Sequence, residues 1–396
     1  MIWRWRIPEP MIRPFLLWPL LLLLTGCSVF SAKDNADPPA ELVELESELK
    51  IKTLWSRSLE GSEDVYLKIA PAISEGRLYI AEPSGEVLAF DALTGKKLWS
   101  VDLDVPISGG PGVNEGLLAV GTQEAELILM DTEDGSQRWR QKVSSEVLSV
   151  PAIGRGQVIC RTIDGRVMSI DTDTGETRWA YDRTVPVLTL RGDSSPIINE
   201  AQALVGFANG KLVALQLDNG VAAWEATITT PKGRTELERV VDIDAELKLV
   251  EGTVYAAAFH GEVAAVSETS GVILWQRELS SHAGLDADWR QIYVSDEEDH
   301  IWSLDATNGA TLWQQKSLHA RRLSAPAMVD GYLVVGDYDG YLHWLSQYDG
   351  RQLARSRAGG DRIRVKPLVH DGIVYVLGEG GKLSALQAEP IEPDNR

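Results

Sequence analysis

The sequence predicts an all-β protein, an eight-bladed β-propeller of four-stranded antiparallel blades, on three observations. The phrase Asp-x-x-x-Gly-x-x-x-Trp recurs, first as DALTGKKLW at 91–99 and again from 131, 171 and 305. A second phrase, in which Pro is followed by apolar residues and Gly, precedes it, as in PAISEGRL from 71. The distance from Pro to Trp, or to their equivalents, is 28 residues in seven copies. Repeats of about 40 residues that contain only strands and turns are typical of propellers.

Each copy is expected to form one blade of short strands separated by turns. The first copy reads GRLYIAE, then GEVLAFD, then KKLWSVDL, in which apolar and polar residues alternate. The complete copies span 71–99, 111–139, 151–179, 196–224, 247–275, 285–313 and 326–354.

The eighth blade is expected to be divided between the two ends of the chain. Its opening phrase begins at Pro367, but the chain ends before the corresponding Trp. Conversely, LWSRSL around Trp55 is a Trp strand with no turn before it. We expect the Trp55 strand to pair with the C-terminal blade and close the ring, which removes a free sheet edge.

The recurring phrase is interpreted as architecture. Its Asp caps the turn, and its Gly supplies the positive φ that a tight turn requires. Its Trp offers a large apolar area for packing against the neighbouring blade. Ala354 breaks the pattern, and the tryptophans assigned to this docking role are Trp55, Trp99, Trp139, Trp179, Trp224, Trp275 and Trp313.

The N-terminus is expected to be a targeting segment. Residues 1–26 combine three Arg with an apolar run over 14–24 that is too short to span a membrane. Leu24-Thr25-Gly26-Cys27 resembles a bacterial lipoprotein signal, which implies that Cys27 becomes the lipidated first residue. Ser28 is not the Asp associated with inner-membrane retention, so the outer membrane is implied. Residues 27–50 are predicted to be an acidic tether, and 51–396 the propeller.

Composition excludes several classes of function. The net charge is −20, which argues against binding a nucleic-acid backbone. The other cysteine, Cys160, occupies an apolar strand position and is expected to be a buried, inert thiol. The six histidines show no metal-binding spacing, so neither a metal site nor a catalytic residue is predicted. GGPGVNEG at 109–116 reads as a turn, and DEED at 296–299 as a solvated turn, with weak cation or partner binding as the alternative.

The connections between blades are where a binding site is expected. They run from each Trp to the next Pro and all lie on one face, and loops on a rigid scaffold commonly carry function. Apart from the closing junction, the two longest are consecutive and follow Trp179 and Trp224, with separations of 17 and 23 positions from the Trp to the next Pro equivalent. The first holds Leu188, Leu190 and Arg191, and the second Asp242 and Asp244. They could form an apolar anchor with a charged rim, or the leucines could tuck into the ring beside solvated charges.

The Gly and Trp phrase is similar to the tryptophan-docking motif of the quinoprotein (PQQ-type) repeat family. That family includes periplasmic dehydrogenases and non-enzymatic propellers. The dehydrogenases hold a calcium-bound quinone at the ring centre and commonly carry an adjacent-cysteine disulfide. This sequence has no such cysteine pair and no recognisable calcium-ligand set, so no cofactor is expected.

A lipid-anchored, acidic propeller with eight such repeats resembles the BamB family of outer-membrane protein assembly factors. The resemblance implies a non-catalytic scaffold of the β-barrel assembly (BAM) machinery that binds the POTRA domains of BamA. It implies that LTLRG at 188–192 and DID at 242–244 make this contact. Strand addition to an exposed edge would bring in unfolded outer-membrane protein clients. A PQQ-dependent periplasmic dehydrogenase and a scaffold of another envelope complex remain as alternatives.

Overall fold

The computed structural model describes residues 37–61, 67–184, 194–232, 234–235, 239–243 and 245–391. The fold reported below is that of the unit Pro39–Arg396. Cys27, Leu188, Leu190, Arg191 and Asp244 lie outside the described residues, as does the predicted signal peptide. Over the described ranges, no helix is both long and apolar enough to cross a membrane.

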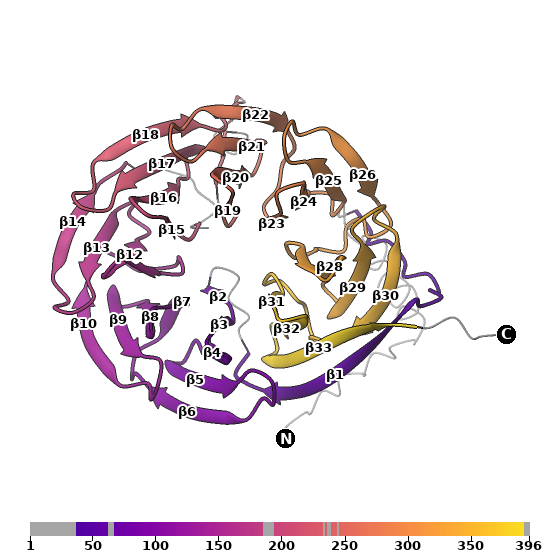
Figure 1. The fold of residues 1–396 in the computed structure, drawn as a ribbon, viewed down its shortest axis with the longest axis horizontal. Helices are drawn as coiled ribbons and strands as arrows, with labels where there is room; N and C mark the ends of the chain where they lie inside the picture. The colour runs from indigo at the N-terminus through magenta and orange to yellow at the C-terminus, as the bar shows by residue number, and fades with distance from the viewer. Residues whose placement is uncertain are drawn as a thin grey trace, which may run out of the picture. The chain divides into compact units, whose positions relative to one another are not determined.

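The predicted eight-bladed propeller is confirmed, with eight antiparallel sheets arranged in a ring (Figure 1). In each blade the strands are given from the inner to the outer one. The first blade consists of β3 (Ala72–Ser74), β4 (Arg77–Ala81), β5 (Glu86–Asp91) and β6 (Lys97–Asp102), and the second of β7 (Ile107–Asn114), β8 (Leu117–Thr122), β9 (Glu126–Asp131) and β10 (Gln137–Lys142). The third consists of β11 (Ala152–Gly154), β12 (Gln157–Arg161), β13 (Val167–Asp171) and β14 (Thr177–Tyr181), and the fourth of β15 (Ile197–Ile198), β16 (Gln202–Gly206), β17 (Lys211–Gln216) and β18 (Ala222–Thr227).

The other four blades follow the same order. The fifth blade consists of β19 (Lys248–Val250), β20 (Thr253–Ala257), β21 (Glu262–Ser267) and β22 (Ile273–Glu278), and the sixth of β23 (Gly284–Ala287), β24 (Gln291–Ser295), β25 (Ile301–Asp305) and β26 (Thr311–Gln315). The seventh consists of β27 (Ala327–Val329), β28 (Tyr332–Gly336), β29 (Tyr341–Ser346) and β30 (Gln352–Arg357), and the eighth of β31 (Leu368–His370), β32 (Ile373–Leu377), β33 (Lys382–Pro390) and β1 (Leu49–Ser58).

The two ends of the chain close the ring within the eighth blade, as predicted. Strand β1 pairs antiparallel with β33, from Leu49 opposite Pro390 to Ser58 opposite Lys382. Figure 1 shows the two strands side by side, β1 in indigo and β33 in yellow. Strand β1 begins at Leu49, two residues before the predicted start of the propeller at Ile51.

The second blade departs from the expected pattern at its inner edge. Strand β2 (Lys68–Ile69) pairs in parallel with β7 and makes this sheet five-stranded. The glycine-rich segment for which the sequence indicates a turn lies instead largely within β7, so that interpretation was wrong. A methyl group on Gly112 would overlap the Pro151 carbonyl of the next blade. The glycines therefore allow the backbone of β7 to approach that of the next blade closely. The predicted turn did not include this contact.

Burial along the strands differs from simple alternation because every blade is covered on both faces. All six residues of β8 are buried, whereas the outer strand β6 alternates between exposed and half-buried positions. The apolar core is accordingly divided among the interfaces between blades. One cluster, for example, joins Tyr79 and Ala89 of the first blade to Leu118 and Ile128 of the second.

Each tryptophan of the repeated phrase packs on the turn of the next blade. The indole Nε1 donates a hydrogen bond of 2.8–3.1 Å to a backbone carbonyl there. The ring covers the turn Gly, and a methyl group on that Gly would lie 2.4–3.0 Å from the nearest ring carbon. A β-bulge next to the Trp, as at Gln137 to Trp139, shifts the register and turns its side chain toward the neighbour.

Candidate partner-binding site

The two long connections leave from neighbouring blades on the same face. The first runs from β14 to β15 and the second from β18 to β19. The structure describes the first at 182–184 and 194–196, and the second apart from 233, 236–238 and 244. The geometry of the site is therefore given by the residues from which the connections depart and by those beneath them.

A cluster of cations around one aromatic ring lies at the start of the first connection, and we call Arg161, Arg183, Phe207 and Glu225 the basal cluster. The guanidinium carbons of Arg161 and Arg183 each lie 5.1 Å from the centre of the Phe207 ring. Arg161 is 2% exposed, and its Nη1 donates to the Gly206 carbonyl at 2.8 Å. Arg183 forms an ion pair of 2.8 Å with Glu225. The hydrogen bond within this pair lowers the pKa of Glu225.

The basal cluster holds the start of the first connection to a fixed base. Cation–π contacts are worth about 0.5–2 kcal/mol each, more when water is excluded. Arg161 belongs to the third blade and Phe207 to the fourth, so the contact also joins the two blades. Sequence reasoning missed this cluster, although a charged residue at the end of the apolar strand VICR was a visible signal.

Asp242 of the second connection lies beneath the surface. It is fully buried, and its carbonyl accepts a hydrogen bond of 2.9 Å from the Phe259 amide. The next residue, Ile243, is also buried and packs over Gly206. The sequence suggested a charged rim at this position, but the structure places the Asp242 side chain inside the loop rather than at its rim.

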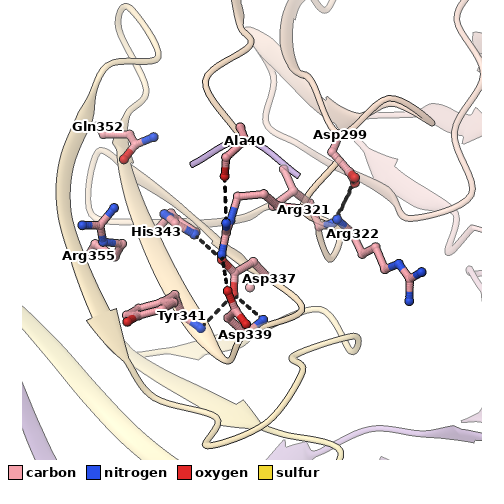
Figure 2. A network of polar contacts seen from close by, with 12 residues as sticks. Ala40, Asp299, Arg321, Arg322, Asp337, Asp339, Tyr341, His343, Gln352 and Arg355 are labelled. Carbon is pink, nitrogen blue, oxygen red and sulfur yellow. Dashed lines mark hydrogen bonds and ion pairs between the residues drawn. The ribbon is translucent and has the colours of Figure 1, made fainter. Parts of the chain in front are cut away.

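A second polar network, which the sequence did not reveal, lies in the seventh blade (Figure 2). Arg321 is 3% exposed and contacts the fully buried Asp337 at 2.8 Å and Asp339 at 2.8 Å. His343, also fully buried, lies 2.9 Å from the same Asp337 oxygen through Nε2. Arg321 Nη1 donates to the carbonyl of Ala40 at 2.9 Å. The network therefore holds the N-terminal segment against this blade from Ala40 onward.

Burial and pairing set the charges in this network. Burial raises the pKa of Asp337, but the His343 hydrogen bond and Arg321 outweigh it and hold the pKa below its usual value. Burial lowers the pKa of His343 more than Asp337 raises it. His343 is therefore neutral at pH 7 and donates its Nε2 hydrogen to an ionised Asp337.

The remaining cysteine has the environment that its sequence position predicted. Cys160 is fully buried, and burial raises the pKa of its thiol to about 12. Since the thiolate is the reactive form, this side chain is chemically inert at neutral pH.

The inner strands surround a central cavity of about 670 Å³. Asp286 on its wall is 6% exposed and pairs with Lys248 at 2.8 Å and with Lys366 at 3.2 Å. Burial raises the pKa of Asp286, but the two lysines outweigh it and hold the pKa below its usual value. The negative charge of Asp286 is thus compensated by two lysines of the same cavity wall.

Comparison with known proteins finds relatives that match nearly the whole chain. A family model described as outer membrane protein assembly factor BamB matches residues 47–107, 83–315 and 303–390. A curated protein of that name from Pseudomonas aeruginosa is 50% identical, and the match covers 93% of this chain and 97% of the relative.

The chain belongs to the BamB family. The crystal structure of BamB from Moraxella catarrhalis has a TM-score of 0.78 at 26% identity, covering 85% of this chain and 100% of that one. The relatives are named outer membrane protein assembly factors, which is a non-catalytic role, so the expectation of a non-catalytic protein is confirmed. A quinohemoprotein alcohol dehydrogenase from Pseudomonas putida, at 13% identity and TM-score 0.65 over 87% of this chain and 78% of that one, shares the fold alone.

Proposed function

We propose that this chain is a scaffold lipoprotein of the BAM machinery, held at the periplasmic face of the outer membrane by a lipid on Cys27. Its surface at the connections after Trp179 and Trp224 binds the POTRA domains of BamA. Membership of the BamB family supports the scaffold role. The lipoprotein signal around Cys27 supports the anchor.

The observation that carries the proposed surface is the basal cluster. It fixes the point from which the first connection leaves, so that the segment carrying Leu188 and Leu190 starts from a rigid base. Apolar side chains at the centre of an interface commonly contribute most of the binding energy. Leu188, Leu190 and Arg191 are the proposed contact residues.

Asp242 acts in this proposal as a positioning residue. Its burial and its backbone pairing with Phe259 hold the second connection against the fifth blade. Asp244, two positions further, is the acidic contact residue of the pair. In this proposal, Leu188 and Leu190 supply the apolar contacts, and Arg191 and Asp244 supply charges of both signs, a combination that is common at interfaces.

The described N-terminal segment is held on the seventh blade. The Ala40 carbonyl is held by Arg321, and Glu48 donates its amide hydrogen to the Leu353 carbonyl at 2.8 Å. The segment that leads toward Cys27 is therefore attached to the seventh blade.

Binding of the full-length protein in detergent to the isolated POTRA region of BamA tests the proposed surface. A Leu190→Glu, Arg191→Glu variant is expected to bind at least about 30-fold more weakly, because hot-spot residues contribute about 2 kcal/mol or more. Circular dichroism verifies that the variant is folded. The matched control is Tyr348→Glu, because Tyr348 is 89% exposed in the turn between β29 and β30 on the opposite face.

The possible results separate the partner from the site. Weaker binding by the double variant alone supports both parts of the proposal. Equal binding by all three proteins keeps the partner and rejects the surface. A wild-type protein that does not bind the POTRA region rejects this partner, and copurification of the lipidated protein from membranes then identifies the complex to which it belongs.

A further inference from the structure

Two histidines and a glutamate from neighbouring segments come together on the face that carries the connections. Glu298 and His300 belong to the loop between β24 and β25, and His319 to the connection between β26 and β27. One ligand atom from each lies within 4.8 Å of the other two. His300 is 8% exposed, His319 is half-buried, and the Glu298 side chain is exposed.

The distances around His300 suit a shared ion better than a hydrogen bond. Its Nδ1 lies 3.4 Å from Glu298 Oε2 and 3.4 Å from Asp296 Oδ2. Hydrogen bonds from nitrogen to oxygen are usually about 2.7–3.2 Å long. In a tetrahedral zinc site with bonds of about 2.0–2.1 Å, neighbouring ligand atoms are about 3.3 Å apart. The His300 nitrogen is thus already at ligand spacing from each of the two carboxylate oxygens.

The second histidine is oriented by the backbone. Its Nδ1 lies 2.9 Å from the Glu298 carbonyl, which can only accept, so Nδ1 carries the hydrogen. Nε2 then bears the lone pair that a metal ion takes, and a backbone carbonyl is a common outer partner of a metal-binding histidine. The two imidazole rings lie 5.3 Å apart at 30° to each other. The three ligand atoms lie within 4.8 Å of one another, and binding an ion would draw them closer together.

The two segments are held together before any ion arrives. The Asp299 carboxylate accepts hydrogen bonds from the Arg322 amide at 2.6 Å and the Leu323 amide at 2.7 Å. The Glu298 carbonyl also accepts from the Ala320 amide at 3.2 Å. Asp299 and Ala320 adopt φ values of 63° and 56°, a conformation that non-glycine residues rarely adopt. The hydrogen bonds between the two loops hold this backbone conformation in place.

We propose that Glu298, His300 and His319 form a binding site for a divalent transition-metal ion of the zinc class, with Asp296 beside it. Two imidazoles and a carboxylate favour zinc or its neighbours over Mg²⁺ and Ca²⁺, which prefer all-oxygen sites. The site adjoins the docked N-terminal segment, because the Ala40 amide donates to the His319 carbonyl at 2.9 Å. An ion there would stiffen the connection on which that segment rests.

Calorimetric titration of the full-length protein in detergent with Zn²⁺ tests this site, with Mg²⁺ as the comparison ion. We expect one Zn²⁺ per chain and no comparable binding of Mg²⁺. Removing a residue that only hydrogen-bonds to a metal ligand weakens metal binding by about 10–100-fold. Removing a ligand itself, as in Glu298→Gln or His319→Asn, should therefore weaken Zn²⁺ binding at least tenfold. Visible absorption of bound Co²⁺ gives a second readout, which should be lost in His319→Asn.

The matched control is His370→Asn, which removes a histidine from β31 in the eighth blade and should bind Zn²⁺ like the wild type. Glu298 is exposed, so Glu298→Gln is expected to stay folded and to decide the question if His319→Asn does not. The proposal is overturned if the wild type shows no saturable Zn²⁺ binding. It is equally overturned if Glu298→Gln binds Zn²⁺ as tightly as the wild type, or if His370→Asn loses as much affinity as the cluster variants.

Discussion

At the scale of single residues, the glycine of the repeated phrase meets two demands at once. Its φ lies between 65° and 76° in all seven copies, a region in which a Cβ is strained. The tryptophan ring of the preceding blade also rests on its Cα, so a Cβ has no space. The turn requirement could be derived from the sequence, but the ring contact could not, because it joins two blades.

A pair of Gly→Ala substitutions separates these two demands. Gly76 has a φ of 72° and no atom within 4 Å of an added methyl group, whereas at Gly220, with a φ of 71°, the methyl would lie 2.6 Å from the Trp179 ring. Gly76→Ala should cost about 1–2 kcal/mol from backbone strain alone. Gly220→Ala should cost about 1–3 kcal/mol more, from overpacking. Urea unfolding measures both, and equal losses would show that the ring contact does not constrain the turn.

At the scale of elements, the interface between the seventh and eighth blades explains why Ala354 replaces the tryptophan. In every other pair, the Trp packs on a Gly in the turn before the next blade's outer strand. The eighth blade takes its outer strand β1 from the N-terminus, so no turn joins β33 to β1. A tryptophan at 354 would have no turn glycine on which to pack. Ala354 is instead 1% exposed within an apolar cluster that includes Leu49.

Ala354→Trp should therefore destabilise the protein, although it restores the repeat pattern. Inserting a large side chain into a filled core costs about 1–3 kcal/mol or more. From the repeat pattern alone, one would expect Ala354→Trp to increase the stability of the protein. Thermal unfolding followed by circular dichroism gives the direction of the change. The matched comparison is Trp313→Ala, which should cost about 3–5 kcal/mol, and an increase in stability for Ala354→Trp would contradict our account of this interface.

At the scale of the whole molecule, the ring is closed by hydrogen bonds and packing rather than by a covalent link. Strand β1 contributes Trp55, which is 8% exposed and donates to the Ala92 carbonyl of the first blade at 2.9 Å. The same strand pairs with β33 along its length. One N-terminal strand thus completes the eighth blade and joins it to the first.

A chain that lacks residues 1–58 should lose its single cooperative unfolding transition and aggregate, because an open β33 edge and an uncovered blade face are exposed. A synthetic peptide of residues 49–58 added to this chain should restore the transition. The same peptide with Trp55→Ala should restore it poorly. Calorimetry and light scattering follow the two effects. Cooperative unfolding of the truncated chain by itself would show that ring closure is not required for stability.

The sequence by itself determined the blade number, the position of each blade and the closure by the Trp55 strand. These features follow from sequence motifs inside a single repeat, because turn residues and the alternation of apolar residues depend only on positions close together in the chain. It also pointed correctly to a buried Cys160. The family could be inferred as well, because the eight repeats and a segment that resembles a lipoprotein signal can be recognised along the chain.

Only the tertiary structure decided which residues meet between blades. It buried Asp242, joined Arg161 and Arg183 through Phe207, and brought His319 to His300 across neighbouring segments. It also buried the middle strands on both faces, as in β8, because each blade lies between two others. These contacts depend on the rotation from one blade to the next, and a linear pattern of residues carries no measure of that rotation.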